Sequence, residues 1–416
     1  MRLRDITVRA RVLQAVRDAR ITDIHTHLFS SNFESLTLRG IDDLLTYHYL
    51  VAETVRWGVT TPEGFWKRSK REQADLVWKT LFIDHSPVSE AAKGVLTVLN
   101  RFGLDTSSRN LDSYREFFDG LSAQEHTDRV FELAAVDNLV MTYDPFNEVE
   151  RKTWQQHPKL DARFKPALRL DAMLNEWEST EDYMRFWGYD VNDYVDIKTC
   201  REVRRFLEEW IDCMDPVYIA SSLPSDFAFP DASARSRLIS ECVLPIAEER
   251  GLPVAFMIGV KRRVNTALKS AGDSAAISDL ASVERLCQLY PSNKFLITML
   301  ARENQHGLCV LSRKFSNLMV FGCWWFLNTP SMIEEITHMR LDLLGFSMIP
   351  QHSDSRVLDH LIYKWEHSRE VIGEVLAQHY EKLAATGWTV SDEDIRRDVA
   401  DLFGGNFWSL AGRQAQ

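Results

Sequence analysis

Eight short apolar runs, each followed by a segment with helical periodicity, are the feature that most constrains how this chain folds. The runs cover residues 21–29, 138–144, 165–171, 216–222, 252–260, 294–300, 317–325 and 345–352. Short apolar runs bounded by Pro, Gly, Asn or Asp are typical of buried strands. Strands that alternate with helices form parallel sheets, and eight is the number that closes a barrel. The sequence therefore predicts the α/β class and a (β/α)8 TIM-type barrel.

One connection is much longer than the others. Residues 30–137 separate the first and second runs and carry helical patterns, which predicts a helical insertion that caps one end of the barrel. Amphipathic helical patterns also follow the eighth run, and no Gly-, Ser- or Pro-rich linker divides the chain. Barrels with insertions can exceed 400 residues. We therefore expect a single domain over residues 1–416, with residues 30–137 as an insertion within it.

The amino-acid composition argues against some classes of binding partner. The chain of 416 residues has 49 Lys and Arg against 60 Asp and Glu, a net charge of −11, so we expect no nucleic-acid partner. Its six cysteines contain no Cys-x-x-Cys pair, which argues against a disulfide framework or a zinc ribbon. The arginine-rich N-terminus reads as an amphipathic surface helix and lacks the apolar core of a secretory signal. We expect a cytoplasmic protein with no membrane partner, and a homo-oligomer stays open.

Two histidines lie two residues apart at the end of the first run. Alternation along a strand turns His25 and His27 to the same face, where two imidazoles can bind one metal ion. Asp23 should share that face, and three unpaired polar groups would be costly to bury. The alternative is a chance His-x-His pair. Barrel enzymes place their chemistry at the carboxyl ends of their strands, which favours a metal role.

A carboxylate follows the eighth run. Asp354 lies two residues after His352 and two before Arg356. Because the first and last strands of a barrel are neighbours, Asp354 can join the two histidines in a set that leaves coordination positions open. The alternative is a structural role in which Asp354 caps the following helix, and this role does not exclude metal binding. We predict one divalent, zinc-like ion bound by His25, His27 and Asp354.

A strand-one His-x-His with a strand-eight Asp resembles the amidohydrolase superfamily of metal-dependent barrels. Within it, the segments TDIHTHLF, TYHYL, ALRLD, GCWWF and SDSR resemble the uronate isomerase, or glucuronate isomerase, family in order and strand position. The resemblance covers nearly the whole chain, the insertion included. It implies an aldose–ketose isomerase with one divalent metal ion. The implied substrates are small hexuronates: D-glucuronate, converted to D-fructuronate, and D-galacturonate, converted to D-tagaturonate.

Two segments depart from the pattern of that family. Met257 stands on strand five where family members carry a histidine, and the segment LPSDF (223–227) replaces an Asp-His-Gly after strand four. The further lysine and histidine ligands that hydrolases of the superfamily carry on strands four to six are also absent from these runs. That absence argues against a two-metal hydrolase, and the chain looks like a divergent branch of the family.

Two arginines could anchor the distal carboxylate of a uronate. Arg169 ends the third run and Arg356 follows the eighth, so both are expected near the carboxyl ends of the strands. Their planar guanidinium groups suit a carboxylate. The alternative for each is a structural ion pair, for example with Asp171 or Asp354.

The isomerisation also needs a group that moves a proton between neighbouring carbons. His48 and Tyr49 lie in the insertion, and a tyrosine hydroxyl can both donate and accept a proton, although a core aromatic is the commoner fate. Of Trp324 and Trp325, the resemblance favours Trp325 as a wall of the substrate pocket. Secondary candidates at the same rim, which could equally start an exposed helix, are Arg302, Asn304 and His306.

No Gly-x-Gly-x-x-Gly motif for a nicotinamide cofactor occurs in the chain. We therefore predict proton transfer through an enediol, with Asp354 or Tyr49 as the base or shuttle, and not hydride transfer. One rival is a mononuclear metal-dependent hydrolase or decarboxylase on the same scaffold. Another is an inactive barrel that serves as a binding subunit.

Overall fold

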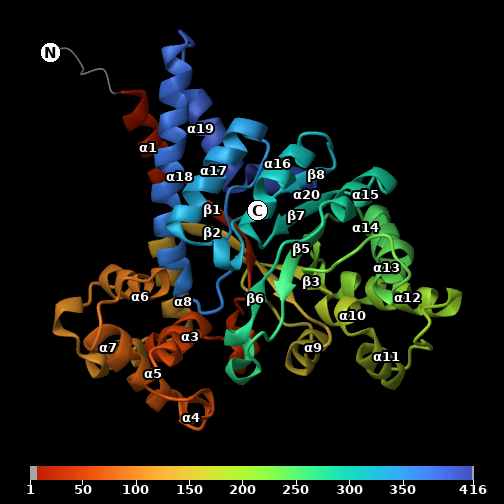
Figure 1. Cartoon of the computed structure of the whole chain (residues 1–416), viewed down its shortest axis with the longest axis horizontal. Helices are drawn as coiled ribbons and strands as arrows, with labels where there is room; N and C mark the ends of the chain where they lie inside the picture. Colours follow the sequence, from red (N-terminus) through yellow and green to blue (C-terminus); the bar gives the residue numbers. More distant parts are fainter. Residues whose placement is uncertain (1–6, 415–416) are drawn as a thin grey trace.

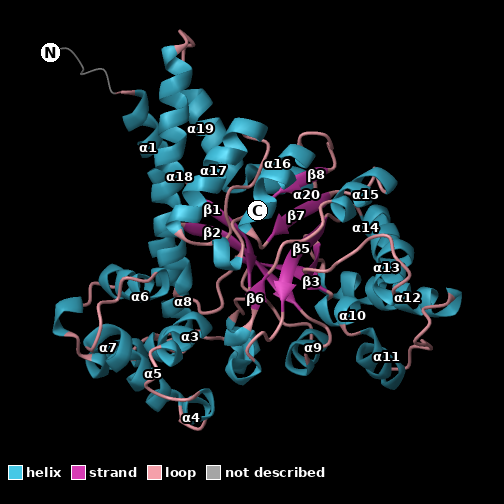
Figure 2. Ribbon diagram, viewed as in Figure 1, coloured by secondary structure: helices cyan, strands magenta, loops and turns pink. Residues whose placement is uncertain are grey.

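Seven parallel strands lie side by side in the order in which they occur along the chain. In the computed structural model, which describes residues 7–414, they surround the centre of the molecule, and helices cover them from outside (Figure 1, Figure 2). The strands are β1 (Ile21–Thr26), β2 (Val136–Tyr143), β3 (Phe164–Arg169), β4 (Ile219–Pro224), β5 (Val254–Lys261), β7 (Phe295–Met299) and β8 (Leu318–Val320). Each falls within, or overlaps, one of the first seven apolar runs, so the predicted α/β class is confirmed.

The eighth apolar run fills the space between β8 and β1 without forming a regular strand. Ile349 forms an isolated parallel bridge with Phe321, just beyond β8. On the other side, the amide of Asp354 donates to the carbonyl of His25 in β1 over 3.1 Å. Backbone hydrogen bonds on both sides close the sheet on itself. The predicted (β/α)8 barrel is thus confirmed, with an irregular last strand.

One further strand was not expected. β6 (Ser274–Ala275) pairs antiparallel with the end of β5, where Val260 opposes Ala275. It belongs to the connection between β5 and β7. Two residues carry too little pattern to be recognised in a sequence.

The connection between β1 and β2 consists mainly of helices joined by short loops. It contains three short helical segments, η1 (Ser31–Leu36), η2 (Lys79–Ile83) and η3 (Thr106–Ser108). Its α-helices are α2 (Ile41–Leu45), α3 (His48–Arg56), α4 (Pro62–Trp66), α5 (Lys70–Trp78), α6 (Glu90–Arg101), α7 (Leu111–Asp119) and α8 (Ala123–Ala134). Figure 1 shows most of them grouped at one side of the barrel, with α6 and α8 against the long helix α18 (His360–Ala385).

The remaining helices surround the barrel. They are α1 (Val8–Asp18), α9 (Glu148–Gln155), α10 (Asp171–Asn175), α11 (Trp177–Phe186), α12 (Ile197–Met214), α13 (Ala234–Leu238), α14 (Leu244–Arg250), α15 (Ala281–Leu289), α16 (Gln305–Ser312), α17 (Pro330–Leu344), α19 (Asp392–Ala400) and α20 (Asn406–Ala411). α1 is the expected N-terminal helix, capped by the Thr7 hydroxyl, and residues 1–6 lie outside the described part. Within residues 7–414, no helix combines the length and apolar character needed to cross a membrane.

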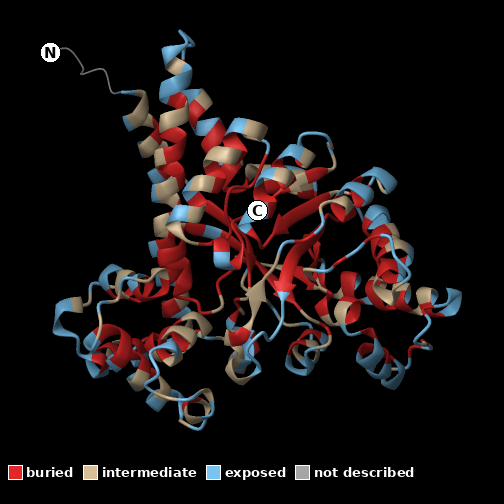
Figure 3. Ribbon diagram, in the orientation of Figure 1, coloured by how far each residue is buried: buried red, intermediate tan, exposed pale blue. Residues whose placement is uncertain are grey.

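Two apolar layers make up the core (Figure 3). The outer layer fills the space between strands and helices. The inner layer combines small and medium side chains, among them Ile24, Val140, Ala167, Ala220, Ala255 and Leu296, with aromatic ones such as Tyr218, Phe321 and Phe407. Because the strands are covered on both faces, they read as nearly continuous apolar runs. This packing leaves the polar residues of the runs gathered at the strand ends.

Candidate active site

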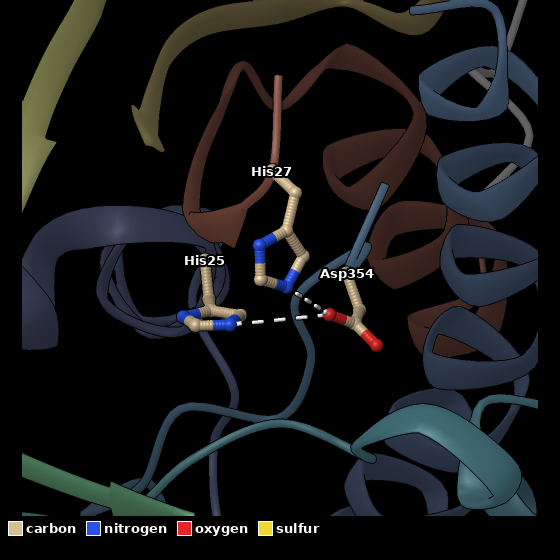
Figure 4. A group of neighbouring side chains, drawn as sticks. All are labelled: His25, His27 and Asp354. Atoms are coloured by element: carbon tan, nitrogen blue, oxygen red, sulfur yellow. Dashed lines mark ion pairs between the residues drawn. The ribbon is translucent and has the colours of Figure 1, made fainter. Parts of the chain in front are cut away.

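The three predicted metal ligands converge at the carboxyl end of β1 (Figure 4). Oδ1 of Asp354 lies 3.3 Å from Nε2 of His27 and 3.9 Å from Nε2 of His25. One ligand atom from each residue lies within 4.8 Å of the other two. Figure 4 shows both rings directed towards the carboxylate. The first strand and the last segment of the barrel therefore bring these residues together as their spacing predicts.

The hydrogen bonds of this trio fit a divalent ion. Nδ1 of His25 lies 3.1 Å from Oη of Tyr218, and Nδ1 of His27 lies 3.2 Å from Oγ1 of Thr142, so each ring presents Nε2 to the site. Among the described residues, Nε2 of His25 and Oδ1 of Asp354 are buried without a hydrogen-bond partner. Unpaired buried polar atoms are costly unless a ligand satisfies them. Burial also lowers the pKa of His25 to about 3, which keeps its imidazole neutral, as metal binding requires.

A β-bulge in β1 determines which side chains enter the site. The three steps from Asp23 to Thr26 oppose only two steps of β2, from Leu139 to Met141. One extra residue in a strand reverses the alternation of side chains beyond it. Residues before and after the bulge therefore no longer follow one period-2 pattern.

The expectation that Asp23 shares a face with His25 and His27 is wrong for this reason. Asp23 instead accepts a hydrogen bond from Nε1 of Trp365 in α18 over 2.9 Å, and another from the amide of Ser353 over 3.0 Å. Burial raises its pKa to about 6. Asp23 thus joins β1 to α18 and to the segment that carries Asp354.

Asp354 does not cap the helix that follows it. α18 begins at His360 with Asp359 as its N-cap residue, beyond Asp354. Asp359 accepts hydrogen bonds from Nε2 of His126 (2.6 Å) and from the amide of Gly40 (2.7 Å), both in the insertion. The capping alternative therefore fails, and the Asp354 carboxylate is left to face the two histidines.

The two predicted arginine anchors have different surroundings. Nη2 of Arg356 lies 3.5 Å from Nε2 of His27. No carboxylate of the described residues lies within 4.0 Å of the Arg356 guanidinium. Arg169 donates to Oδ2 of Asp171 over 2.6 Å, and Oδ1 of Asp171 accepts from the amide of Ser222 over 2.8 Å. Burial opposes the charge of Arg169, but Asp171 outweighs it and raises the pKa of the guanidinium above its ordinary value. The structural ion pair weighed for Arg169 is present, whereas Arg356 has a free positive charge.

His48 and Tyr49 reach the site from the start of α3. The ring centroid of His48 lies 6.1 Å from that of Trp325, and Tyr49 stacks on Phe326 at 6.0 Å. Burial, aided by Arg356, lowers the pKa of His48 to about 3, and burial raises the pKa of Tyr49 well above its ordinary value. The imidazole is therefore neutral and the phenol protonated.

Two buried nitrogens in the aromatic group of His48, Tyr49, Trp325 and Phe326 have no hydrogen-bond partner among the described residues. They are Nε2 of His48 and Nε1 of Trp325. Trp325 is 6% exposed and has a positive φ of 49°, a strained conformation that often marks functional sites. Both nitrogens can bind the hydroxyl groups of a polar ligand.

The remaining candidates lie elsewhere. Met257 is buried in the apolar interior of the barrel, between Ser222 of β4 and Thr298 of β7, where a family histidine was expected. Arg302 forms an ion pair with Glu335 at the surface through three hydrogen bonds. His306 is exposed, and Asn304 binds the backbone of Ser278. After β7, the exposed-helix alternative holds for Arg302 and His306, whereas Asn304 is buried.

Sequence reasoning did not identify the residues that hold the ligands in place. These partners, Thr142 for His27 and Tyr218 for His25, come from β2 and from the segment just before β4. Their residue types are common in cores, and their positions relative to the ligands follow only from the fold. No pattern in the sequence could have indicated them.

The fold and this site define an enzyme of the barrel class, with its polar residues gathered at the carboxyl ends of the strands. No protein-family model and no curated protein sequence matches the chain. A solved structure of a uronate isomerase from Bacillus halodurans C-125 is 54% identical, with a TM-score of 0.97 over 100% of this chain and 98% of that chain. This chain belongs to the uronate isomerase family.

Two more distant structures share the fold alone. A uronate isomerase from Thermotoga maritima is 17% identical, with a TM-score of 0.79 over 97% of each chain. A glucuronate isomerase from Caulobacter crescentus is 15% identical, with a TM-score of 0.75 over 98% of this chain and 94% of that chain. The barrel with its insertion thus persists where most side chains differ.

Proposed function

We propose that this protein is a hexuronate isomerase that interconverts D-glucuronate and D-fructuronate, and D-galacturonate and D-tagaturonate. Family membership supports the reaction class. The observation that carries the substrate class is Arg356, a guanidinium 3.5 Å from His27 with no carboxylate partner among the described residues. A partly buried cation without a counter-ion favours an anionic ligand such as the carboxylate of a uronate.

His25, His27 and Asp354 would hold one divalent metal ion, and two imidazoles with one carboxylate suit zinc. When bound, the ion supplies positive charge that polarises a substrate oxygen and lowers the pKa of a hydroxyl. Three protein ligands leave room for that oxygen.

The side chains around the trio divide the remaining tasks. Arg356 binds the substrate carboxylate. Arg169 already pairs with Asp171, and its remaining N–H groups donate to the same substrate carboxylate. The protonated Tyr49 donates a hydrogen bond to a substrate oxygen, because its raised pKa prevents it from acting as a base at neutral pH. Asp354 then takes the proton from C2 and returns it at C1 through an enediol, while the Tyr49 hydroxyl gives its proton to O1 and takes up the proton of the C2 hydroxyl in one concerted transfer, so that the phenol stays neutral. His48 and Trp325 bind and enclose the sugar.

Incubation of the metal-loaded protein with D-glucuronate and D-galacturonate tests the proposal. Nuclear magnetic resonance should show the corresponding keto sugars accumulating to a fixed equilibrium from either direction. Release of carbon dioxide would favour the decarboxylase instead. No conversion of either uronate by protein that contains its metal would refute the isomerase.

A further inference from the structure

Asp354 presents its carboxylate from a strained backbone conformation. Its φ of 54° lies in the left-handed region, which residues other than glycine rarely adopt. Such a conformation persists only where the surrounding structure holds it. The residues that bind the backbone just before Asp354 therefore determine where the carboxylate points.

Asn328, in the loop between β8 and α17, binds that backbone directly. Its Nδ2 donates to the carbonyl of Ser353 over 3.0 Å and to the carbonyl of His352 over 3.3 Å. Its Oδ1 accepts from Nε2 of Gln351 over 3.0 Å. The side chain is 1% exposed, so water does not compete for these bonds. One amide thus contacts three consecutive residues that precede Asp354.

Gln351 completes the arrangement from the other side. Its Oε1 accepts from the amide of Cys323 over 2.8 Å and from the amide of His352 over 3.1 Å. Its Nε2 also reaches Oγ of Ser368 in α18 over 3.3 Å. Because the side chain of Gln351 bonds both Asn328 and the backbone of His352, the two amides fix each other's orientation.

A buried ion pair fixes the main chain of Asn328 as well. Nζ of Lys364 in α18 donates to the Asn328 carbonyl over 3.4 Å and to Oε1 of Glu90 over 2.6 Å. Glu90 begins α6, a helix of the insertion. The position of Asn328 is therefore set jointly by the insertion and by α18.

We propose that Asn328 is a positioning residue that, together with Gln351, holds residues 352 and 353 so that Asp354 faces His25 and His27. The inference rests on the metal site of the proposed function and is independent of the substrate. Asn328 has no contact with that trio in the structure, and it acts through the backbone. Its loss should release the strained conformation and misplace one ligand of three.

Zn²⁺ affinity of the metal-free protein, measured by competition with a chromogenic chelator, tests the proposal without recourse to activity. We expect Asn328→Ala to weaken the affinity about 10- to 100-fold, the usual effect of removing a residue that orients a metal ligand. Asn293→Ala is the matched control, because Asn293 is 2% exposed and its Nδ2 also donates to a carbonyl, that of Leu244. The control should lose comparable thermal stability but keep its Zn²⁺ affinity within twofold of wild type. An unchanged affinity in Asn328→Ala would overturn the inference.

A second variant and a second measurement cover the remaining outcomes. If Asn328→Ala does not fold, the same Zn²⁺ titration is made with Asn328→Asp. This variant keeps the side-chain volume but has no N–H group to donate to the two carbonyls. Failure of both to fold, while Asn293→Ala folds, would assign Asn328 to general stability and reject the proposal. A crystal structure of the metal-free variant should show Asp354 outside its left-handed conformation. If wild type binds no Zn²⁺ but the variant shows that displacement, the metal site fails and the positioning role stands. An undisplaced Asp354 would reject the positioning role.

Discussion

Gly322 and His352 approach so closely that no side chain fits between them. A Cβ on Gly322 would lie 1.8 Å from Cδ2 of His352, and the φ of Gly322 is +65°. The ring centroid of His352 lies 5.2 Å from that of His25. Gly322 therefore lets the last segment of the barrel come close enough to β8 for His352 to pack beside a predicted metal ligand.

Gly322→Ala should displace His352 and with it the segment that leads to Asp354. We expect a loss of about 2–4 kcal/mol in the free energy of unfolding, about 1 from the positive φ and the rest from overpacking. Gly251→Ala is the matched control, since Gly251 also has a φ of +65° but has no atom within 4 Å of its Cβ position. Urea unfolding measures both. Equal losses in the two variants would show that the contact with His352 is unimportant.

Replacement of both histidines should abolish metal binding. We expect elemental analysis to find one divalent ion per wild-type chain and close to none in the variant with His25→Ala and His27→Ala, because Asp354 alone is a weak ligand. His306→Ala, at an exposed histidine outside the site, should retain the ion. An unchanged metal content in the double variant would disprove the site.

Arg356→Met should impair turnover of both uronates. A charge-assisted hydrogen bond contributes about 1.5–3 kcal/mol, which corresponds to roughly a tenfold to hundredfold loss in kcat/KM. Arg302→Met removes an arginine of the surface pair with Glu335 and should leave the kinetics unchanged. If Arg356→Met kept wild-type kinetics, the guanidinium would have a structural role.

Burial of Glu150 should make stability depend on pH. Burial raises the pKa of Glu150 from 4.5 to about 8, so the folded protein holds this proton more tightly than the unfolded chain. The contribution of Glu150 to stability is therefore fully present below about pH 4.5 and is lost as pH rises through about 8, by about 1.4 kcal/mol per unit of pKa difference.

Glu150→Gln removes this dependence while its amide oxygen can still accept from the amide of Asp144, a bond of 2.8 Å in the structure. Relative to wild type, the variant should gain stability between pH 5 and pH 8.5, as measured by thermal unfolding. A stability difference that is the same at both pH values would refute this assignment.

Isomerisation in heavy water distinguishes the enediol from a hydride shift. An enediol exchanges its carried proton with solvent, so deuterium should appear at C1 or C2 of the sugar. Tyr49→Phe should slow turnover, because a protonated phenol is lost from the site. The mechanism would be rejected by rapid conversion without deuterium at either carbon, combined with full activity of Asp354→Asn and Tyr49→Phe.

The barrel and its metal trio could be predicted because both depend on simple periodicities. Buried parallel strands produce apolar runs such as residues 252–260, which contain most of β5. The adjacency of first and last strands places Asp354 beside His25 and His27 without any coordinates. The same reasoning placed Arg356 at the site.

The rest depends on contacts that no local pattern encodes. The bulge that turns Asp23 towards Trp365 adds one residue to β1, and a run of six buried residues has no alternation to reveal it. The role of Asn328 follows from carbonyl groups distant in sequence. The partner of Arg169 could be named but not chosen, because Asp171 and Asp354 were both expected near the carboxyl ends of the strands.

The irregular last strand would give a metal ion bound at the proposed site a structural role as well. The barrel closes between β8 and β1 through an isolated bridge and a few backbone hydrogen bonds, whereas pairs such as β2–β3 and β5–β7 share uninterrupted five-residue ladders. An ion held by His25, His27 and Asp354 would link β1 to the last segment of the barrel across this seam. At a hundredfold excess over its Kd it would stabilise the closed barrel by about 2.7 kcal/mol. If the proposed site binds its ion, metal depletion should therefore first accelerate amide hydrogen exchange along the seam, and the ion would control the opening of the fold as well as the chemistry.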